Sequence, residues 1–105
     1  MKHTNLQKYQ ETLRKKFINQ GVKIVAPETV YFFKDTRIGK NVTIEPYVVF
    51  GKKVTIDNNS TIKSFSHIEN VRIGKNVSVG PFARLRPGTI IKSGSKIGNF
   101  VEVKK

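Results

Sequence analysis

Large aliphatic or aromatic residues recur at intervals of six along most of the chain. Ten of the eleven steps are six residues long, and the series is Ile38, Ile44, Phe50, Ile56, Ile62, Ile68, Ile73, Val79, Leu85, Ile91, Ile97 and Val103. A small or β-branched residue stands two places before each member, at Thr36, Val42, Val48, Val54, Ser60, Ser66, Val71, Val77, Ala83, Thr89, Ser95 and Val101. In an amphipathic helix the apolar residues recur at steps of three and four, and in a β-sandwich apolar and polar residues alternate along strands that irregular loops interrupt. Neither gives a regular step of six. The pattern therefore predicts a mainly β fold, a parallel β-helix of hexapeptide repeats.

Three hexapeptides close one triangular coil, so the repeats from residue 38 onward predict between three and four coils. Each corner needs residues that tolerate a left-handed backbone. We expect that role for Gly39, Gly51, Gly74, Gly80, Gly98, Asn41, Asn59 and Asn76. The step from Ile68 to Ile73 is only five residues long, which predicts one tightened corner.

Residues 1–20 have a different period and predict an N-terminal amphipathic α-helix. Its apolar stripe consists of Leu6, Tyr9, Leu13 and Phe17. Thr4 and Gln7 form a candidate capping box, and Gly21 ends the helix. We expect the stripe to dock on the β-helix, where it would cap the N-terminal end, or on a neighbouring subunit, in preference to a membrane surface. Residues 22–37 suggest short extended pieces with a turn at Pro27, and we divide the chain into the helix at 1–20 and a truncated β-helix at 21–105.

The chain has 105 residues and a net charge of +13, with 20 Lys and Arg against 7 Asp and Glu. The absence of cysteine excludes a disulfide scaffold, a thiol nucleophile and a Cys-ligated zinc. Nothing resembles a membrane span or a signal peptide, so we expect a cytoplasmic protein. The lysines are spread along the whole chain without a nucleic-acid-binding motif or an aromatic platform, which makes nucleic acid an unlikely partner.

A short solenoid has two open ends that must be covered. The sequence ends at Lys105, directly after the repeat residue Val103, with no capping segment. Association with further chains is the natural remedy, and we expect a homotrimer in which flat faces pack together.

The strings PFARLRPG at residues 81–88 and GNFVEVKK at residues 98–105 resemble a known enzyme family. This is the family of the bifunctional N-acetylglucosamine-1-phosphate uridylyltransferase and glucosamine-1-phosphate N-acetyltransferase, which makes UDP-N-acetylglucosamine for the cell wall. The likeness continues more loosely through GVKIVAPETVYF, DTRIGKNVTIEP and FSHIENVRIG, and the helix resembles the arm that joins the family's two domains. The resemblance implies left-handed coils, trimers and acetyltransferase sites between subunits.

Within this resemblance, Arg86 and Lys104 match the Arg and Lys that hold the sugar phosphate of the acceptor. They are eighteen residues apart, so the period alone stacks them on one face, one coil apart. A phosphate is well held by a guanidinium and an ammonium that converge on it. We expect Arg84 to point outward in a structural role. His67 is also expected to point outward, as an ordinary surface residue rather than a base or a ligand.

No catalytic residue and no metal site is predicted. The related metal-dependent hydratases require three histidine ligands, whereas this chain has only His3 and His67. The family's nucleotidyltransferase domain, its histidine base and its acetyl-CoA surface have no counterpart here, so enzyme activity is uncertain and no cofactor is expected to bind this chain alone.

Two functions remain open from the sequence. In the first, the chain is an acetyltransferase-like protein, inactive alone, that contributes part of a glucosamine 1-phosphate site to a partner chain carrying the missing coils. Acetyl-CoA is the acetyl donor implied for the complete enzyme. In the alternative, the chain is a non-catalytic trimeric scaffold or the relic of a truncated gene.

Overall fold

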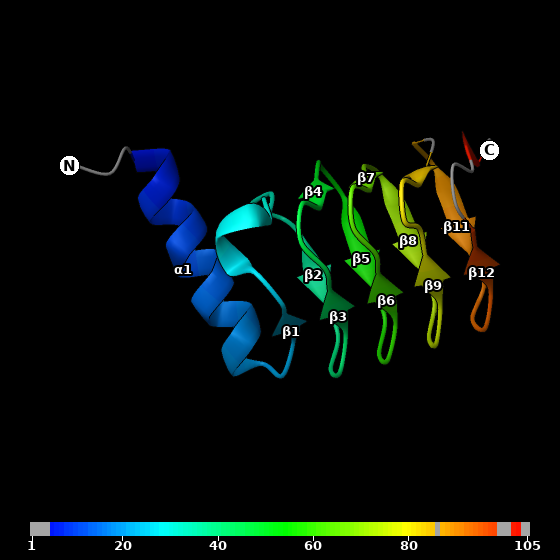
Figure 1. Cartoon of the computed structure of the whole chain (residues 1–105), viewed down its shortest axis with the longest axis horizontal. Helices are drawn as coiled ribbons and strands as arrows, with labels where there is room; N and C mark the ends of the chain where they lie inside the picture. The colour runs from blue at the N-terminus through cyan, green and yellow to red at the C-terminus, as the bar shows by residue number, and fades with distance from the viewer. Residues whose placement is uncertain (1–4, 86, 99–101, 104–105) are drawn as a thin grey trace.

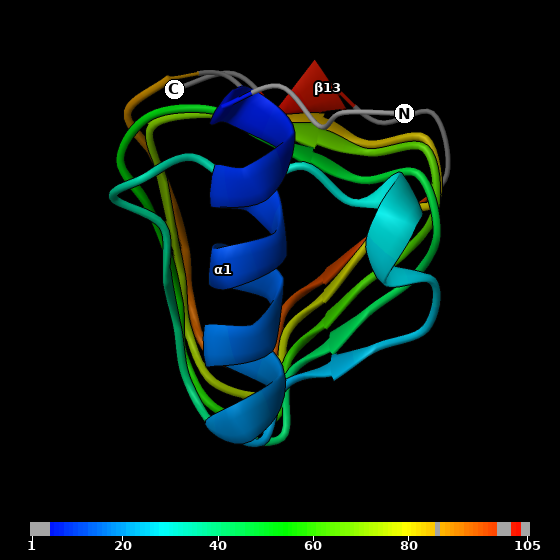
Figure 2. The ribbon, with the colours of Figure 1, turned by 90° about the vertical axis from the view of Figure 1, so that its left-hand side faces the viewer.

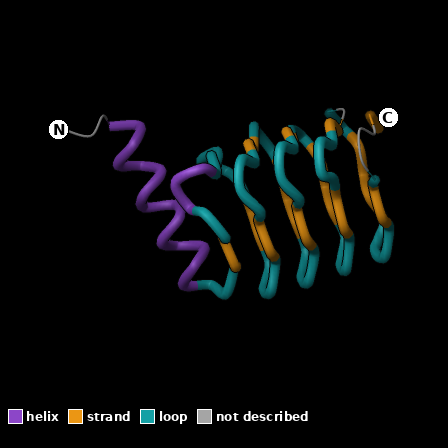
Figure 3. Tube along the Cα trace, viewed as in Figure 1, coloured by secondary structure: helices purple, strands orange, loops and turns teal. Residues whose placement is uncertain are grey.

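Short parallel strands stack into three sheets that run along the molecule (Figures 1 and 3). The computed structural model describes residues 5–85, 87–98 and 102–103. Sheet A contains β1 (Lys23–Ile24), β3 (Thr43–Ile44), β6 (Thr61–Ile62), β9 (Ser78–Val79) and β12 (Lys96–Ile97). Sheet B contains β4 (Val49–Phe50), β7 (His67–Ile68), β10 (Arg84–Leu85) and β13 (Glu102–Val103). Sheet C contains β2 (Arg37–Ile38), β5 (Val54–Ile56), β8 (Val71–Ile73) and β11 (Thr89–Ile91).

The chain visits the sheets in the order A, B, C and then returns to A, which makes a triangular solenoid of about four turns. Figure 2 looks down its axis from the N-terminal end, where the path runs counterclockwise as it recedes from the viewer. The coil is therefore left-handed, against the usual right-handed preference for parallel crossovers. The predicted fold class is confirmed.

Residues 22–38 form the first coil, of which the six-residue series includes only Thr36 and Ile38. Val22 and Ile24 are buried on sheet A, and Val30 and Phe32 are buried on the sheet B side. Lys23 pairs with a residue twenty positions later, whereas Tyr31 bridges to Val49, eighteen positions later. The two extra residues lie in a short 3-10 helix, η1 (Pro27–Thr29), and this insertion hides the first coil from a six-residue count.

The five-residue step produces the predicted tightened corner. Across it, Val54 pairs with Val71 at a separation of seventeen residues instead of eighteen.

The inward serines are buried but hydrogen-bonded, as Ser60 shows. Ser60 donates its hydroxyl to the Gly74 carbonyl at 2.7 Å and accepts the Val77 N–H at 3.0 Å. An inward serine is tolerated because the hydroxyl is hydrogen-bonded on both sides.

The inward positions of the hexapeptides form one continuous core. Sixteen of its buried apolar residues come from residues 38–91: Ile38, Val42, Ile44, Val48, Phe50, Val54, Ile56, Ile62, Ile68, Val71, Ile73, Val77, Val79, Ala83, Leu85 and Ile91. Buried Thr36, Ser60, Ser66 and Thr89 occupy the smaller inward position, as the double pattern predicts. Ile97 packs against this core and is partly buried.

Helix α1 (Asn5–Asn19) lies across the N-terminal end of the solenoid, as Figure 2 shows, so the predicted cap is confirmed. The ring of Phe17 lies 4.8 Å from that of Phe32, which in turn stacks on Phe50 at 5.4 Å. The helix ends at Asn19 and is followed, as expected, by the helix-terminating Gly21, where φ is +97°. No helix in the described part of the chain is long and apolar enough to cross a membrane.

Hydrogen bonds attach the helix to the open strand edge. Gln10 is buried, donates Nε2 to the Phe32 carbonyl at 2.7 Å, and accepts the Phe32 N–H at 2.9 Å. Arg14 donates Nε and Nη2 to the Val30 carbonyl at 3.2 and 2.9 Å. The prediction that Tyr9 belongs to the docked stripe is wrong, because Tyr9 remains 44% exposed while Gln10 takes the inward place. Thr4 and the side chain of Leu6 lie outside what the structure describes.

Two kinds of glycine occupy the corners, which corrects the single role that we expected. Gly80 has a left-handed backbone, as do Asn41, Asn59 and Asn76. Gly39, Gly51 and Gly74 do not, and a Cβ atom on any of them would press on the next coil, at Asn58, Glu69 and Ser93. These three glycines permit coils to approach one another, whereas the asparagines provide the turn.

Candidate functional site

The strands that precede Arg86 and Lys104 are paired, although these two residues lie outside the described part of the chain. Arg84 pairs with Glu102 and Leu85 pairs with Val103, so β10 and β13 are in register one coil apart. This register is the eighteen-residue repeat on which the prediction for Arg86 and Lys104 depends. The convergence of the two side chains stays a prediction.

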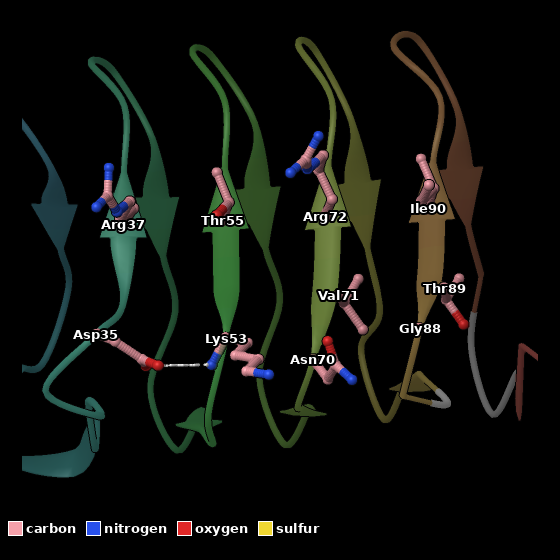
Figure 4. A pocket seen from close by; sticks show the side chains of 10 residues that line it. All are labelled: Asp35, Arg37, Lys53, Thr55, Asn70, Val71, Arg72, Gly88, Thr89 and Ile90. Atoms are coloured by element: carbon pink, nitrogen blue, oxygen red, sulfur yellow. Dashed lines mark hydrogen bonds between the residues drawn. The ribbon is translucent and has the colours of Figure 1, made fainter.

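A shallow groove of about 590 Å³ lies on the outer face of sheet C, beside the corner that joins sheets B and C. Arg37, Thr55 and Arg72 project into it from β2, β5 and β8, in one row (Figure 4). Gly88 and Thr89 line its far end and follow Arg86 by two and three residues in the sequence. The groove therefore leads along the solenoid toward the segment that carries the predicted phosphate residue.

The groove is electropositive. Its lining contains Arg37, Arg72 and Lys53, but only one carboxylate, that of Asp35. Asp35 accepts the backbone N–H of Lys53 through both carboxylate oxygens, at 3.1 and 3.2 Å (Figure 4). Because guanidinium groups bind phosphate and carboxylate groups well, the chemistry that this face favours is the binding of an anion.

Sequence reasoning missed this row of residues. The signal that could have found its two arginines is the repeat itself, because each precedes an inward isoleucine, Ile38 or Ile73, and so must point outward on the same sheet. The five-residue step between Ile68 and Ile73 obscures this relation.

The structure places His67 on the outer face of sheet B. It is exposed and pairs with Val49 on one side and Arg84 on the other, so the predicted outward orientation of both His67 and Arg84 is confirmed. The groove on sheet C lies on a different face. Within the described residues, no three His, Cys, Asp or Glu side chains gather as metal ligands would.

Comparisons with known proteins agree with the repeat and with the resemblance noted from the sequence. The model of the bacterial transferase hexapeptide family, described as six repeats, matches residues 35–70 and 70–105. The chain is 54% identical over 97 residues to the bifunctional protein GlmU of Sphingopyxis alaskensis, and equally identical over the same length to that of Zymomonas mobilis. The GlmU protein of Wolbachia pipientis is 52% identical over 96 residues.

These alignments cover nearly the whole chain but a small part of each relative. They span 92% of the chain in the first two cases and 91% in the third, and 22% of each relative. The chain thus spans about a fifth of the length of the curated relatives that it matches. Among solved structures, the acetyltransferase domain of PglB from Neisseria gonorrhoeae aligns with a TM-score of 0.38 and 16% identity, over 96% of this chain and 60% of that one, which is too weak a likeness to inform function.

Proposed function

This chain belongs to the bacterial hexapeptide transferase family, and on that premise we propose that it forms acceptor-binding coils of a GlmU-like acetyltransferase. In this proposal the chain holds glucosamine 1-phosphate while an acetyl group is transferred from acetyl-CoA to the amine. The observation that carries the proposal is the 54% identity to two GlmU proteins over 92% of the chain. The expected location is the cytoplasm.

Arg86 and Lys104 are the residues proposed to hold the sugar phosphate. The pairing of β10 with β13 supports this role, because it gives the strands just before these two residues an eighteen-residue register. A guanidinium can donate two N–H groups to a phosphate, and an ammonium adds a second positive charge. The positive groove on sheet C supports the same role, since it would attract an anion toward this part of the molecule.

Acetyl transfer to an amine also needs a base that removes the ammonium proton. His67 is the one histidine among the described residues, and it faces outward on sheet B beside Arg84. We therefore assign the base and the acetyl-CoA surface to a segment beyond these 105 residues or to a partner chain. The active assembly is proposed to be a trimer, with the acceptor site between copies.

Ligand-dependent thermal stabilisation tests the binding role. A ligand that binds only the native state at a hundredfold excess over its Kd stabilises it by about 2.7 kcal/mol. We expect glucosamine 1-phosphate to raise the Tm of the wild-type chain, and Arg86→Ala to weaken binding by roughly 10- to 150-fold, since a charge-assisted hydrogen bond contributes about 1.5–3 kcal/mol. Glucosamine without the phosphate should produce no shift.

Arg84→Ala is the matched control, because it removes the same charge two residues away from an exposed position on sheet B. It should keep the ligand-induced shift. If both variants lose the shift equally, the binding reflects general positive charge and no phosphate site is present. If the wild-type chain shows no shift in any assembly state, the alternative of a non-catalytic scaffold takes the place of the proposal.

A further inference from the structure

Three aromatic rings form a ladder along one edge of the solenoid. Tyr47 stacks on Phe65 with ring centroids 5.4 Å apart, and Phe65 stacks on Phe82 at 5.0 Å. The three residues occupy the same position in successive coils, at the corner between sheets A and B. We call residues 46–49, 64–67 and 80–83 the aromatic corner.

The backbone at this corner does not explain the choice of residues. Tyr47, Phe65 and Phe82 have φ values of +61°, +61° and +57°. Bulky side chains rarely adopt this left-handed conformation, whereas Gly and Asn adopt it readily. A corner that served only to turn the chain would therefore be expected to hold Gly or Asn.

The rings are also exposed, so burial within the chain does not explain them either. The exposed fractions are 57% for Tyr47, 54% for Phe65 and 43% for Phe82. Val49 and Tyr31, which bridge to each other on the adjoining edge of sheet B, are 43% and 37% exposed. Together these side chains make an apolar strip that follows the solenoid axis over several coils.

The geometry of the ladder argues against a platform for bases or sugars. Interplanar angles of 5° and 9° mean that the rings lie face to face, so the middle ring has both faces covered by its neighbours. Stacking of a nucleobase requires an open ring face. The ladder presents mainly ring edges to the outside, which is the arrangement of a packing surface.

The low charge of the aromatic corner favours a second copy of this basic chain as the partner. The segments PYVV, SFSH and GPFA of the aromatic corner contain no Lys, Arg, Asp or Glu, although the chain as a whole has a net charge of +13. Glu45, which accepts the Ser64 N–H at 3.2 Å, and Lys63 directly precede the first two segments, whereas lysines lie within both other corners, for example Lys53 between sheets B and C and Lys75 between sheets C and A. Two copies of so basic a chain repel each other least where neither presents a cation.

From the ladder, its exposure and the missing charge, we infer that the aromatic corner is the surface through which copies of this chain pack side by side. Aromatic residues are enriched, and charged residues depleted, in the centres of protein interfaces. Because the strip is parallel to the solenoid axis, it aligns the coils of neighbouring copies. The inference rests on the trimer that is part of the proposed function. It adds that the aromatic corner forms the interface between the copies.

The oligomeric mass of Phe65→Asn tests this surface. Asparagine suits the left-handed backbone and removes the central ring, so the coil itself should be preserved. We expect sedimentation equilibrium to give a trimer for the wild-type chain and an association at least about thirtyfold weaker for Phe65→Asn, the effect of losing one interface hot spot. Ile90→Asn is the matched control, because Ile90 is 69% exposed on sheet C, and its mass should stay that of the wild type.

A second measurement keeps the inference testable if Phe65→Asn does not fold. The chain contains no cysteine, so a single one can be introduced without a competing thiol. Val49→Cys places the thiol on the edge of the strip and keeps the three rings, so it should cross-link copies under mild oxidation much faster than Ile90→Cys. Equal cross-linking of the two variants would overturn the inference.

The outcomes separate this surface from the rest of the proposal. If the wild-type chain is a trimer and Phe65→Asn is also a trimer of unchanged affinity, the aromatic corner is not the interface, although the trimer itself stands. A wild-type chain that is monomeric at all concentrations overturns both, while the binding of glucosamine 1-phosphate is still decided by the Tm measurement. Equal dissociation of the Phe65 and Ile90 variants would mean unspecific association, and would also overturn the assignment of this corner.

Discussion

Two corners flank sheet A, and they solve the same backbone problem with opposite kinds of side chain. The corner between sheets C and A, here called the asparagine corner, holds Gly21, Asn41, Asn59, Asn76 and Gly94, all with positive φ. The aromatic corner holds the same conformation with Tyr47, Phe65 and Phe82. The coil thus requires a left-handed turn at both corners. The backbone requirement is the same, so the difference in side chains must have a second cause.

The energetic consequence differs between the two corners. A left-handed backbone costs an ordinary L-residue roughly 1–2 kcal/mol. A stacked aromatic pair contributes roughly 0.5–1.5 kcal/mol beyond its burial, and the described ladder has two such pairs for three rings. Within one chain, stacking alone therefore does not offset the backbone cost, and contacts with another copy would add stabilisation by burying the exposed ring edges.

The largest effect on stability is expected from Gly80→Ala at the start of the aromatic corner. Gly80 has φ +89°, and a Cβ atom there would lie 2.6 Å from the hydroxyl of buried Ser66. Ser66 cannot move freely, because its Oγ accepts the Ala83 N–H. Adding an overpacking cost of about 1–3 kcal/mol to the left-handed backbone cost, we expect a loss of about 2–5 kcal/mol in urea unfolding.

Gly94→Ala at the asparagine corner is the control for this variant. Gly94 has φ +82°, but no atom lies within 4 Å of the position that its Cβ would take. Only the backbone cost of about 1–2 kcal/mol should remain. Equal losses for the two glycines would show that the close approach to Ser66 is relieved without cost.

An intermediate effect is expected from Asn59→Val, which places a β-branched residue at the asparagine corner. Asn59 has φ +64°, and its N–H donates to the Lys40 carbonyl of the preceding coil at 3.0 Å. Valine should lower stability by about 1–2 kcal/mol, because it resists this backbone conformation. For a domain of this size that corresponds to a decrease of roughly 4–16 °C in Tm.

Asn59→Gly should leave the Tm nearly unchanged, since glycine adopts the same φ without steric cost. If glycine destabilises as much as valine does, the asparagine side chain contributes contacts of its own. The contrast between the two corners would then need a different explanation.

The repeat predicted the coils well because a period constrains every inward residue at once. Even inward serines such as Ser60 and Ser66 could be placed, although they are not apolar. The six-residue count did not extend through the first coil, although residues 21–105 were assigned to the β-helix, because the two extra residues around η1 break the count between Ile24 and Phe32. A fixed repeat length locates only those coils that have the same length.

The cap and the aromatic corner could not be predicted by the same kind of reasoning. An apolar stripe favours Tyr9 over Gln10, but an open strand edge needs hydrogen-bond partners, and Gln10 provides both a donor and an acceptor. At the corners, conformational preference leads one to look for Gly and Asn, so Tyr47, Phe65 and Phe82 passed unnoticed. Their common place, three residues before Phe50, Ile68 and Leu85, was present in the sequence. Arg86 and Lys104 remain predictions from the period and the resemblance.

The smallest effect on stability is expected for Phe65→Asn in the unassociated chain, and this variant distinguishes the two corners most directly. The variant loses two stacked pairs of about 0.5–1.5 kcal/mol each and relieves part of a backbone cost of about 1–2 kcal/mol. The middle values, a loss of about 2 kcal/mol in stacking and a relief of about 1 kcal/mol in the backbone, leave a decrease of only about 1 kcal/mol in the free energy of unfolding, measured by urea at a concentration below association, while the same substitution weakens assembly strongly. A loss above about 3 kcal/mol in the monomer would mean that the ladder holds the coil together from within. The aromatic corner would then be structural in the same sense as the asparagine corner, and its exposure would need no partner.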